Sequence, residues 1–449
     1  MSWITFILEK SKFIGLLILL GIAAQLFLSR PRWQYYPLYL AAASYFILVA
    51  LNYFNAFEIT SRNSKWMIGI GLFLISTSLL LLLIFPKEKL PIPSGPFEVG
   101  TRIYDLEDKT RDEIYTETQN DHRKIKYQIW YPTDETEGFK KAKWITDGKI
   151  LTRQLAQSFH LPSFMLDHTV EIDANSYVDA PVSAVQKSYP VVVISHGWQG
   201  FRELHTDFAE ELASQGFIAV SIDHTYGSQA VKFEDGSVAY LNKEALPGES
   251  DPVKFGNAST LLVTTYGEDV ATVLDDLEKQ NATDGDFKGR LDLEALGLLG
   301  HSTGGGGSVS IALKDNRIKA LLGLDAWVNP IGSDILKQGL AIPALFIRSE
   351  QWSIGPNNVA LDMLRKNSED ATLMQMNRTA HVDFSMSYMF SPLMKYIGFS
   401  GEMGGRKSSE IQKELILDFF DYHLRNPDDE AANDLEEITD KYEDLLLID

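Results

Sequence analysis

The sequence predicts an α/β protein in which helices cover both faces of a mostly parallel sheet, preceded by three transmembrane helices. Beyond residue 188, short apolar or β-branched runs alternate with amphipathic helical patterns for more than 200 residues, as in doubly covered parallel sheets. Before residue 90, three apolar runs contain no charged residue. A chain of 449 residues with 45% hydrophobic composition has room for several domains and is not generally disordered.

The three apolar runs predict a membrane domain over residues 1–89. They comprise residues 13–28, 35–57 and 66–85. About 20 apolar residues cross a bilayer as a helix, so the second and third runs qualify directly, and the first can cross with little tilt. The first run could instead be a cleaved signal peptide with Lys10 and Lys12 as its basic segment. Two further spans follow at once and favour the membrane helix.

The basic residues that flank these runs do not decide the orientation in the membrane. Four fall on each side, namely Lys10, Lys12, Arg62 and Lys65 against Arg30, Arg32, Lys87 and Lys89. The positive-inside rule therefore gives a tie. Three spans place the two ends of the chain on opposite sides. We expect a multi-pass protein of the cell membrane, with its N-terminus inside and its catalytic part outside.

Three segments follow the membrane domain. Residues 90–100 contain three prolines and predict an extended linker, and residues 101–426 predict the catalytic domain. Residues 427–449 predict an acidic C-terminal tail, as a solvated helix or a frayed end rather than a specific partner site. The formal net charge of −20 argues against a nucleic acid as partner. The absence of cysteine excludes a disulfide-stapled scaffold and any thiolate metal site.

The catalytic domain alternates predicted strands and helices. The strands are expected at 190–195, 217–222, 296–299, 318–324, 343–348 and 372–376. Helices are expected at 204–216, 267–279 and 411–422, where apolar residues recur at helical spacing. This order places the carboxyl ends of the parallel strands along one edge of the sheet, where such folds bind ligands.

The segment Gly300-His301-Ser302-Thr303-Gly304 matches the G-x-S-x-G elbow, in which a strand turns sharply into a helix with serine at the apex. Gly304–Gly307 would each cost about 1 kcal/mol relative to alanine in a helix, so four together indicate close packing. The motif predicts an α/β-hydrolase fold with Ser302 as nucleophile. A glycine-rich turn with an incidental serine is the alternative.

The base and the acid follow from chain order, which in this fold runs serine, acid, histidine. Only His381 and His423 follow Ser302. His423 falls within the last helical pattern, whereas His381 lies in a loop just after the final strand and is the predicted base. Asp325 and Glu350 both follow strands, and Asp325 is preferred because it lies directly at its strand end.

The oxyanion of the tetrahedral intermediate that follows attack by a serine needs two backbone donors. We expect the amide of Thr303, after the nucleophile, and that of Trp198, in the glycine-containing loop after an early strand. His196 precedes the nucleophile and is interpreted as a structural loop residue. Asp223-His224 could be a metal pair, but no further ligands stand at useful spacing, so loop structure is preferred. No metal or cofactor is predicted.

With these residues in view, the segment from Gly95 to Leu424 resembles the plasma-type platelet-activating factor acetylhydrolase family and related bacterial esterases. The similarity is carried by residues 95–100, 129–132, 193–197, 201–202, 212–217, 300–302, 304–305 and 381–384. The resemblance implies ester hydrolysis without metal or organic cofactor. It places the nucleophile on Ser302, the acid on Asp325, the base on His381 and the oxyanion amides on Trp198 and Thr303.

The sequence thus predicts a membrane-anchored serine carboxylic ester hydrolase that acts on a small-molecule or lipid ester, with a short-acyl or lipid-like substrate. It departs from the family where Thr303 replaces a frequent phenylalanine, in its N-terminal spans, and at 140–186, which would form part of the acyl pocket or a lid. A catalytically inactive membrane receptor or binding module, an acyltransferase and a peptidase are the alternatives. The oligomeric state is left open.

Overall fold

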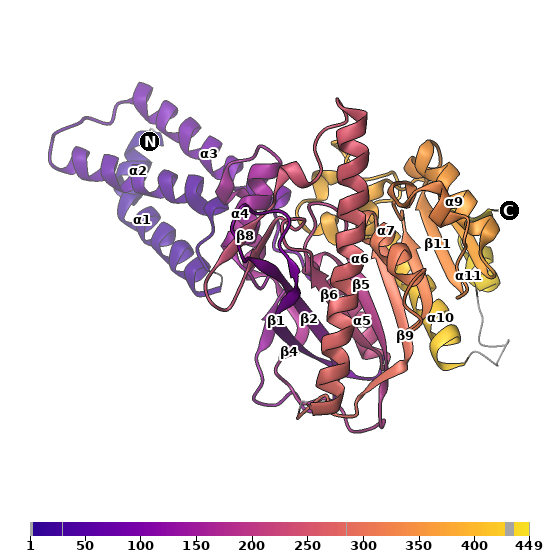
Figure 1. Ribbon diagram of the computed structural model, residues 1–449. Coiled ribbons are helices and arrows are strands. Elements are labelled where there is room, and N and C mark those ends of the chain that lie inside the picture. Colours follow the sequence, from indigo (N-terminus) through magenta and orange to yellow (C-terminus); the bar gives the residue numbers. More distant parts are fainter. Residues whose placement is uncertain (1–2, 29, 284, 427–434, 449) are drawn as a thin grey trace.

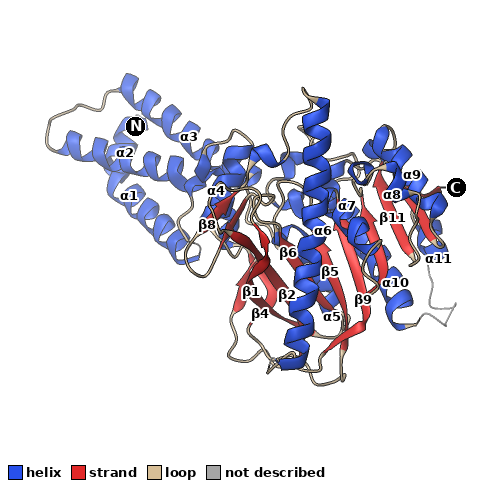
Figure 2. Cartoon of the chain, viewed as in Figure 1, coloured by secondary structure: helices blue, strands red, loops and turns tan. Residues whose placement is uncertain are grey.

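The computed structural model describes residues 3–28, 30–283, 285–426 and 435–448. In this part of the chain, eleven strands form one sheet, and a separate pair consists of β7 (Ala230–Lys232) and β8 (Val238–Tyr240). Figure 2 shows helices on both sides of the large sheet. This arrangement is consistent with the predicted α/β-hydrolase fold.

The large sheet is parallel at its centre, has an antiparallel strand at the end formed by residues 445–448 and is mixed towards the end formed by residues 141–143. In spatial order its strands are β13 (Leu445–Ile448), β12 (Ala371–Met376), β11 (Ala344–Ser349), β10 (Ile318–Leu324), β9 (Leu291–His301), β5 (Tyr189–Ser195), β6 (Ile218–Asp223), β2 (His122–Thr133), β1 (Glu98–Asp112), β4 (Asp173–Val178) and β3 (Lys141–Lys143). Neighbours from β12 to β6 run parallel. Strands β13 and β2 flank this block and are antiparallel to it. Each predicted strand is present, so the mostly parallel sheet is confirmed.

Helices of the catalytic domain lie between these strands in the chain. They are α4 (Lys149–Ser158), α5 (Thr206–Ser214), α6 (Pro252–Thr283), α7 (Thr303–Ala312), α8 (Ser333–Leu336), α9 (Pro356–Asn367), α10 (Gly405–Arg425) and α11 (Leu435–Lys441). Helix α6 begins well before the predicted residue 267. Its first half contains Gly256 and several β-branched residues, which weaken the helical pattern, while Leu262 and Tyr266 are buried by tertiary packing.

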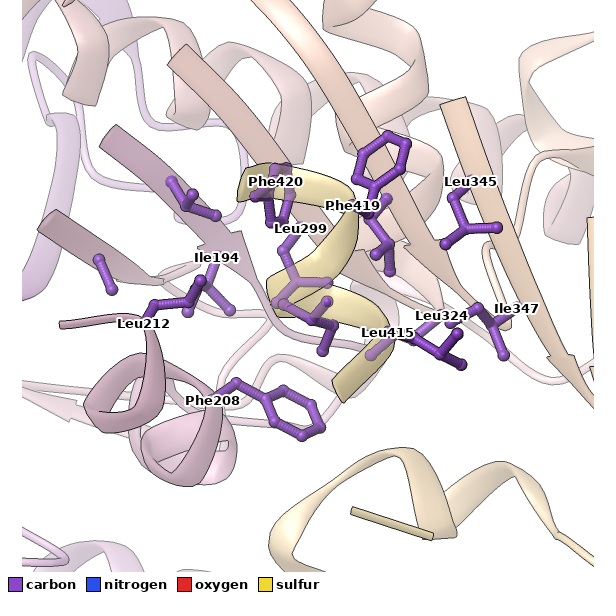
Figure 3. Packing of buried hydrophobic residues seen from close by; sticks show 14 of the residues in the cluster. Ile194, Phe208, Leu212, Leu299, Leu324, Leu345, Ile347, Leu415, Phe419 and Phe420 are labelled. Carbon is purple, nitrogen blue, oxygen red and sulfur yellow. The ribbon is translucent and has the colours of Figure 1, made fainter. Parts of the chain in front are cut away.

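The core lies on both faces of the sheet. Along β5, Val192 and Ile194 face the side covered by α5 and α10, whereas Val191 and Val193 face the side covered by α6. Figure 3 shows the first of these clusters, which also contains Phe208, Leu212, Leu299, Leu324, Leu345, Ile347, Leu415, Phe419 and Phe420. Because both faces are buried, the strand reads as a continuous apolar run.

Three N-terminal helices project at one end of the molecule (Figure 1): α1 (Trp3–Leu28), α2 (Tyr36–Tyr53) and α3 (Ser61–Ile84). Helical residues 33–53 and 62–84 are long and apolar enough to cross a membrane, whereas the apolar stretch 13–28 of α1 is shorter. Two of the three predicted spans therefore meet the length criterion. The end of α3 contacts the catalytic domain, where Ser391 Oγ donates to the Ile84 carbonyl at 2.7 Å.

The predicted linker 90–100 is packed rather than free. The Gly95 N–H donates to Ser214 Oγ at 3.1 Å, and a Cβ on Gly95 would lie 2.1 Å from the Ser214 carbonyl oxygen. The last three residues of the segment already belong to β1, which begins at Glu98. The segment is therefore an extended connection that is fixed against α5.

The structure of the C-terminal segment 427–449 differs in part from the prediction. Residues 427–434 and 449 lie outside the described residues. The remainder forms α11, which agrees with the predicted helix, and β13. Ile438 and Leu445 are buried, so the segment is not a freely solvated or frayed end there. The physical reason is that Leu445–Ile448 is an apolar run that pairs antiparallel with β12 and covers its outer edge.

Candidate active site

Ser302 lies at the sharp turn between β9 and α7. Its backbone has φ 54° and ψ −120°, a conformation that non-glycine residues rarely adopt and that is typical of functional sites. A Cβ on Gly300 would lie 2.6 Å from the Gly304 carbonyl oxygen, and one on Gly304 would lie 2.2 Å from the Ser195 carbonyl oxygen. The two motif glycines are therefore required by close backbone approach, as the sequence predicts.

The next three glycines pack the start of α7 against its neighbours. A Cβ on Gly305 would lie 2.7 Å from Ala326 Cα, and one on Gly306 would lie 2.2 Å from the Trp327 carbonyl oxygen. A Cβ on Gly307 would lie 2.7 Å from Tyr266 Cβ. The glycine run thus lets α7 approach both α6 and the loop after β10, which fixes Ser302 at the carboxyl edge of the sheet.

His381 and Asp325 form a hydrogen-bonded pair at the same edge. His381 Nδ1 lies 2.9 Å from Asp325 Oδ2. Ser349, at the end of β11, donates to the same carboxylate from its N–H at 2.7 Å and from its Oγ at 2.6 Å. When Nδ1 carries the proton that it donates to Asp325, His381 Nε2 carries the lone pair that a general base needs.

The two rival residues lie elsewhere. Glu350 is exposed, and its Oε2 accepts the Arg378 N–H at 2.7 Å. His423 lies on α10, where its ring packs 4.6 Å from that of Phe419. The structure therefore brings Asp325, and not Glu350, to His381.

Ser302 and His381 line one cavity of about 560 Å³, together with Trp198 and Thr303. The rest of its lining is mainly apolar and includes Leu155, Phe159, Leu204, Phe390, Met394 and Phe399. Leu155 and Phe159 come from α4 and the turn after it. The segment 140–186 thus supplies part of the pocket wall.

The loop after β5 passes directly over the nucleophile, since a Cβ on Gly197 would lie 2.9 Å from Ser302 Cβ. Within the described part of the chain, neither the Trp198 nor the Thr303 N–H has a hydrogen-bond acceptor. Thr303 opens α7, where a backbone N–H has no partner inside the helix. Both N–H groups thus lack an acceptor in the described chain, as the donors of an oxyanion hole must.

His196 fixes the direction of one of these amides. The Gly197 carbonyl oxygen lies 2.7 Å from His196 Nδ1 and accepts the Gly200 N–H at 2.9 Å. This carbonyl and the Trp198 N–H belong to the same planar peptide and point in opposite directions. Holding the carbonyl therefore orients the Trp198 N–H, so His196 supports the loop as the sequence predicts.

Asp223 and His224 belong to buried networks. Asp223 pairs with Arg202. His224 Nε2 lies 2.7 Å from Ser195 Oγ, and His224 Nδ1 lies 3.0 Å from Asp269 Oδ2. Burial opposes ionisation of Asp269, but Arg123 outweighs it and holds the pKa of this carboxyl well below its ordinary value. Among the described residues, no cluster of three or more histidines and carboxylates could hold a metal ion.

Sequence reasoning missed several residues around His381. Ser349 orients Asp325, His301 lies against the base with ring centroids 4.7 Å apart, and Trp352 stacks on it at 4.2 Å. One signal was available, because Ser349 and Trp352 lie at or just after the end of a parallel strand. The sequence does not show which strand end faces the base.

Comparison with known proteins identifies the family. Residues 82–246 and 258–442 match platelet-activating factor acetylhydrolase, isoform II. The chain belongs to this family. The match begins at residue 82, so α1, α2 and nearly all of α3 precede it.

The relatives of this chain include the platelet-activating factor acetylhydrolase of Cavia porcellus. It is 26% identical over 388 residues, which are 79% of this chain and 80% of the relative. A probable 1-alkyl-2-acetylglycerophosphocholine esterase of Arthroderma benhamiae is 22% identical over 394 residues, 80% of this chain and 94% of the relative. The chain is thus a carboxylic ester hydrolase.

The fold is shared with a solved structure, a ferulic acid esterase from Streptomyces cinnamoneus. The two superpose with a TM-score of 0.65 and 19% identity over 81% of this chain and 100% of the esterase. The α/β-hydrolase fold that the resemblance implies is therefore confirmed.

Proposed function

We propose that this protein is a membrane-anchored serine ester hydrolase that cleaves short-acyl or lipid-like esters through Ser302, His381 and Asp325. The observation that carries the proposal is that a strained serine lines the same cavity as a histidine held by a buried aspartate. This arrangement meets the requirements of a triad, namely a nucleophile, a base and a group that orients the base.

In the proposed mechanism, His381 Nε2 takes the proton of Ser302 Oγ as the oxygen attacks the ester carbonyl carbon. Asp325 stabilises the imidazolium, which then gives its proton to the leaving alcohol as the carbon–oxygen bond breaks. A water molecule gives a proton to His381, attacks the acyl-enzyme and releases the acid, and the proton returns to Ser302. The Trp198 and Thr303 amides stabilise the tetrahedral oxyanion in both steps.

The substrate class follows from the cavity and from the relatives. The lining residues from α4 and from 385–399 are largely apolar, so they suit an acyl or alkyl chain. Of the two relatives given above, one is named for the removal of acetyl from platelet-activating factor and the other for an ester of 1-alkyl-2-acetylglycerophosphocholine. We therefore propose an ester with a short acyl group and a lipid-like alcohol as substrate.

The test uses the full chain in detergent micelles with p-nitrophenyl esters from acetyl to palmitoyl. Ser302→Ala should abolish turnover. Ser310→Ala is a matched control, because Ser310 lies on α7 with the same 8% exposure but does not line the cavity. Turnover by Ser302→Ala at the wild-type rate would overturn the mechanism. The highest activity on the palmitoyl ester would overturn the proposal of a short-acyl substrate. Transfer of the acyl group to added hydroxylamine, without hydrolysis, would favour an acyltransferase.

We further propose that α1, α2 and α3 span the membrane, with the N-terminus inside and the catalytic domain outside. The chain contains no cysteine, so a single introduced cysteine reports its own location. In intact cells, a membrane-impermeant maleimide should label Val185→Cys, in an exposed loop of the catalytic domain, but not Asn55→Cys, between α2 and α3. The reverse pattern, or labelling of both, would overturn this topology.

A further inference from the structure

The short 3₁₀ helix η6 (Glu350–Trp352) contacts the loop that carries His381 at each of its three residues. Glu350 Oε2 accepts the Arg378 N–H at 2.7 Å, and Gln351 Oε1 accepts the His381 N–H at 2.8 Å. The Trp352 ring lies parallel to the imidazole, with 4.2 Å between the centroids and an interplanar angle of 3°. Two backbone bonds and one ring contact thus fix both the loop and the plane of the base.

The ring contact changes in strength during the reaction. The face of an indole is the negative end of its quadrupole, so it attracts a cation placed above it. The imidazole of His381 is neutral before attack and becomes a cation in the transition state. An interaction that is stronger in the transition state than in the ground state accelerates the reaction.

We propose that Trp352 is a positioning residue for ester hydrolysis, which holds the His381 ring and stabilises its imidazolium form through the indole face, while Glu350 and Gln351 anchor the loop. The inference rests on the proposed role of His381 as base. It also gives a role to Glu350, the rejected candidate for the triad acid.

The other titratable groups around His381 do not supply this contact. Asp325 faces it from the end of β10 through the Nδ1 bond. His301, from β9, is neutral, because burial and the nearby His381 hold its pKa well below its ordinary value. Asp383, two residues along the chain, accepts the N–H groups of Ala380 and Gly401. Trp352 therefore adds a contribution that is separate from the carboxylate.

The test compares Trp352→Leu, which keeps apolar bulk, with Trp352→Phe, which keeps an aromatic face, in the full chain with p-nitrophenyl acetate. We expect Trp352→Leu to lower kcat by roughly 5- to 30-fold, a loss that corresponds to the free energy of one cation–π contact. We also expect the acid limb of its kcat/KM profile to move to lower pH by several tenths of a unit, because protonation of the base becomes less favourable. In Trp352→Phe, both kcat and the acid limb should stay close to those of the wild type.

A purely structural role predicts a different pattern. If Trp352 only packs the loop, Trp352→Leu lowers kcat without moving the acid limb, and Trp352→Phe does not restore it; this result would overturn the inference. Gln351→Ala is the matched variant, since it removes the acceptor of the His381 N–H and should lower kcat without a shift of the limb.

Ser302→Ala separates the two proposals. If it remains active, the proposed triad fails. If Ser302→Ala is inactive while Trp352→Leu matches the wild type in both kcat and pH profile, only the role of Trp352 fails. Thermal melting of each variant in detergent shows whether it is folded, and Trp352 is only partly buried, which favours a folded Leu variant.

Discussion

The proposed triad of Ser302, His381 and Asp325 lies in the same domain as a second array, formed by Ser195, His224 and Asp269. The two share a His–Asp contact and differ in access to solvent. His381 lies 2.9 Å from Asp325 and keeps 25% of its side chain exposed in the cavity that Ser302 also lines. His224 lies 3.0 Å from Asp269 and 2.7 Å from Ser195, with none of its side chain exposed. Hydrogen-bond geometry alone does not identify an active site, because a nucleophile also needs room for its substrate.

The buried array instead holds the fold around the site. Ser195 ends β5, just before the loop that carries Trp198, and Asp269 also binds Arg123 and Arg111. Burial lowers the pKa of His224, although Asp269 opposes the shift. The array thus consists of internal hydrogen bonds and ion pairs that anchor β5 and β6 to α6.

The largest expected difference between the arrays concerns their histidines. His381→Gln should reduce kcat by on the order of 10⁴- to 10⁶-fold, because the proposed base is lost. His224→Gln should leave kcat within several-fold and lower the free energy of unfolding by about 1–3 kcal/mol, because buried partners lose hydrogen bonds. Steady-state kinetics and thermal melting measure the two effects. A His224→Gln protein with wild-type melting but no turnover would contradict the comparison.

Substitutions of Asp325 and Asp269 should differ in the same way, the first in catalysis and the second in stability. Asp325→Asn should lower kcat by about 10⁴-fold, because the amide no longer favours the required tautomer. Asp269→Asn should keep catalysis in its folded fraction but cost about 3–5 kcal/mol, because buried Arg123 loses the carboxylate of Asp269 and keeps only that of Glu113.

Glu350→Gln is the control for the choice of acid. The amide keeps an oxygen that can accept the Arg378 N–H, so we expect a loss of less than tenfold in kcat. A loss equal to that of Asp325→Asn would mean that Glu350 is the acid of the triad.

The smallest expected difference is in the pH dependence of stability. Although burial opposes it, Arg123 holds the folded pKa of Asp269 below its ordinary value of 3.8. Such a group stabilises the protein above its unfolded pKa, and this contribution is lost as the pH falls through 3.8 towards the folded value. Melting temperatures between pH 7 and pH 3 should therefore fall less steeply in Asp269→Asn than in the wild type. Parallel curves would show that Asp269 does not contribute.

Much of the site could be predicted because it depends on short segments and chain order. The glycines around Ser302 predict a tight turn, and only two histidines follow it in the sequence. Asp325 could be preferred to Glu350 because it lies directly at its strand end, but each follows a parallel strand, so the sequence alone does not show which carboxylate contacts His381. The role of Trp352 could not be predicted, because ring stacking depends on two loops that are separated by a helix and a strand.

The sequence by itself determined the order of strands and helices and the elbow at Ser302, since periodicity and glycine spacing act between neighbours in the chain. Chain order led to the prediction of His381 as base. The tertiary structure decided that Asp325 reaches His381, that His224 and Asp269 are sealed from solvent, and that Leu445–Ile448 closes the edge of the sheet. These outcomes depend on which strand ends lie side by side and which surfaces other elements cover. Sheet order and packing set them through contacts between residues far apart in the chain.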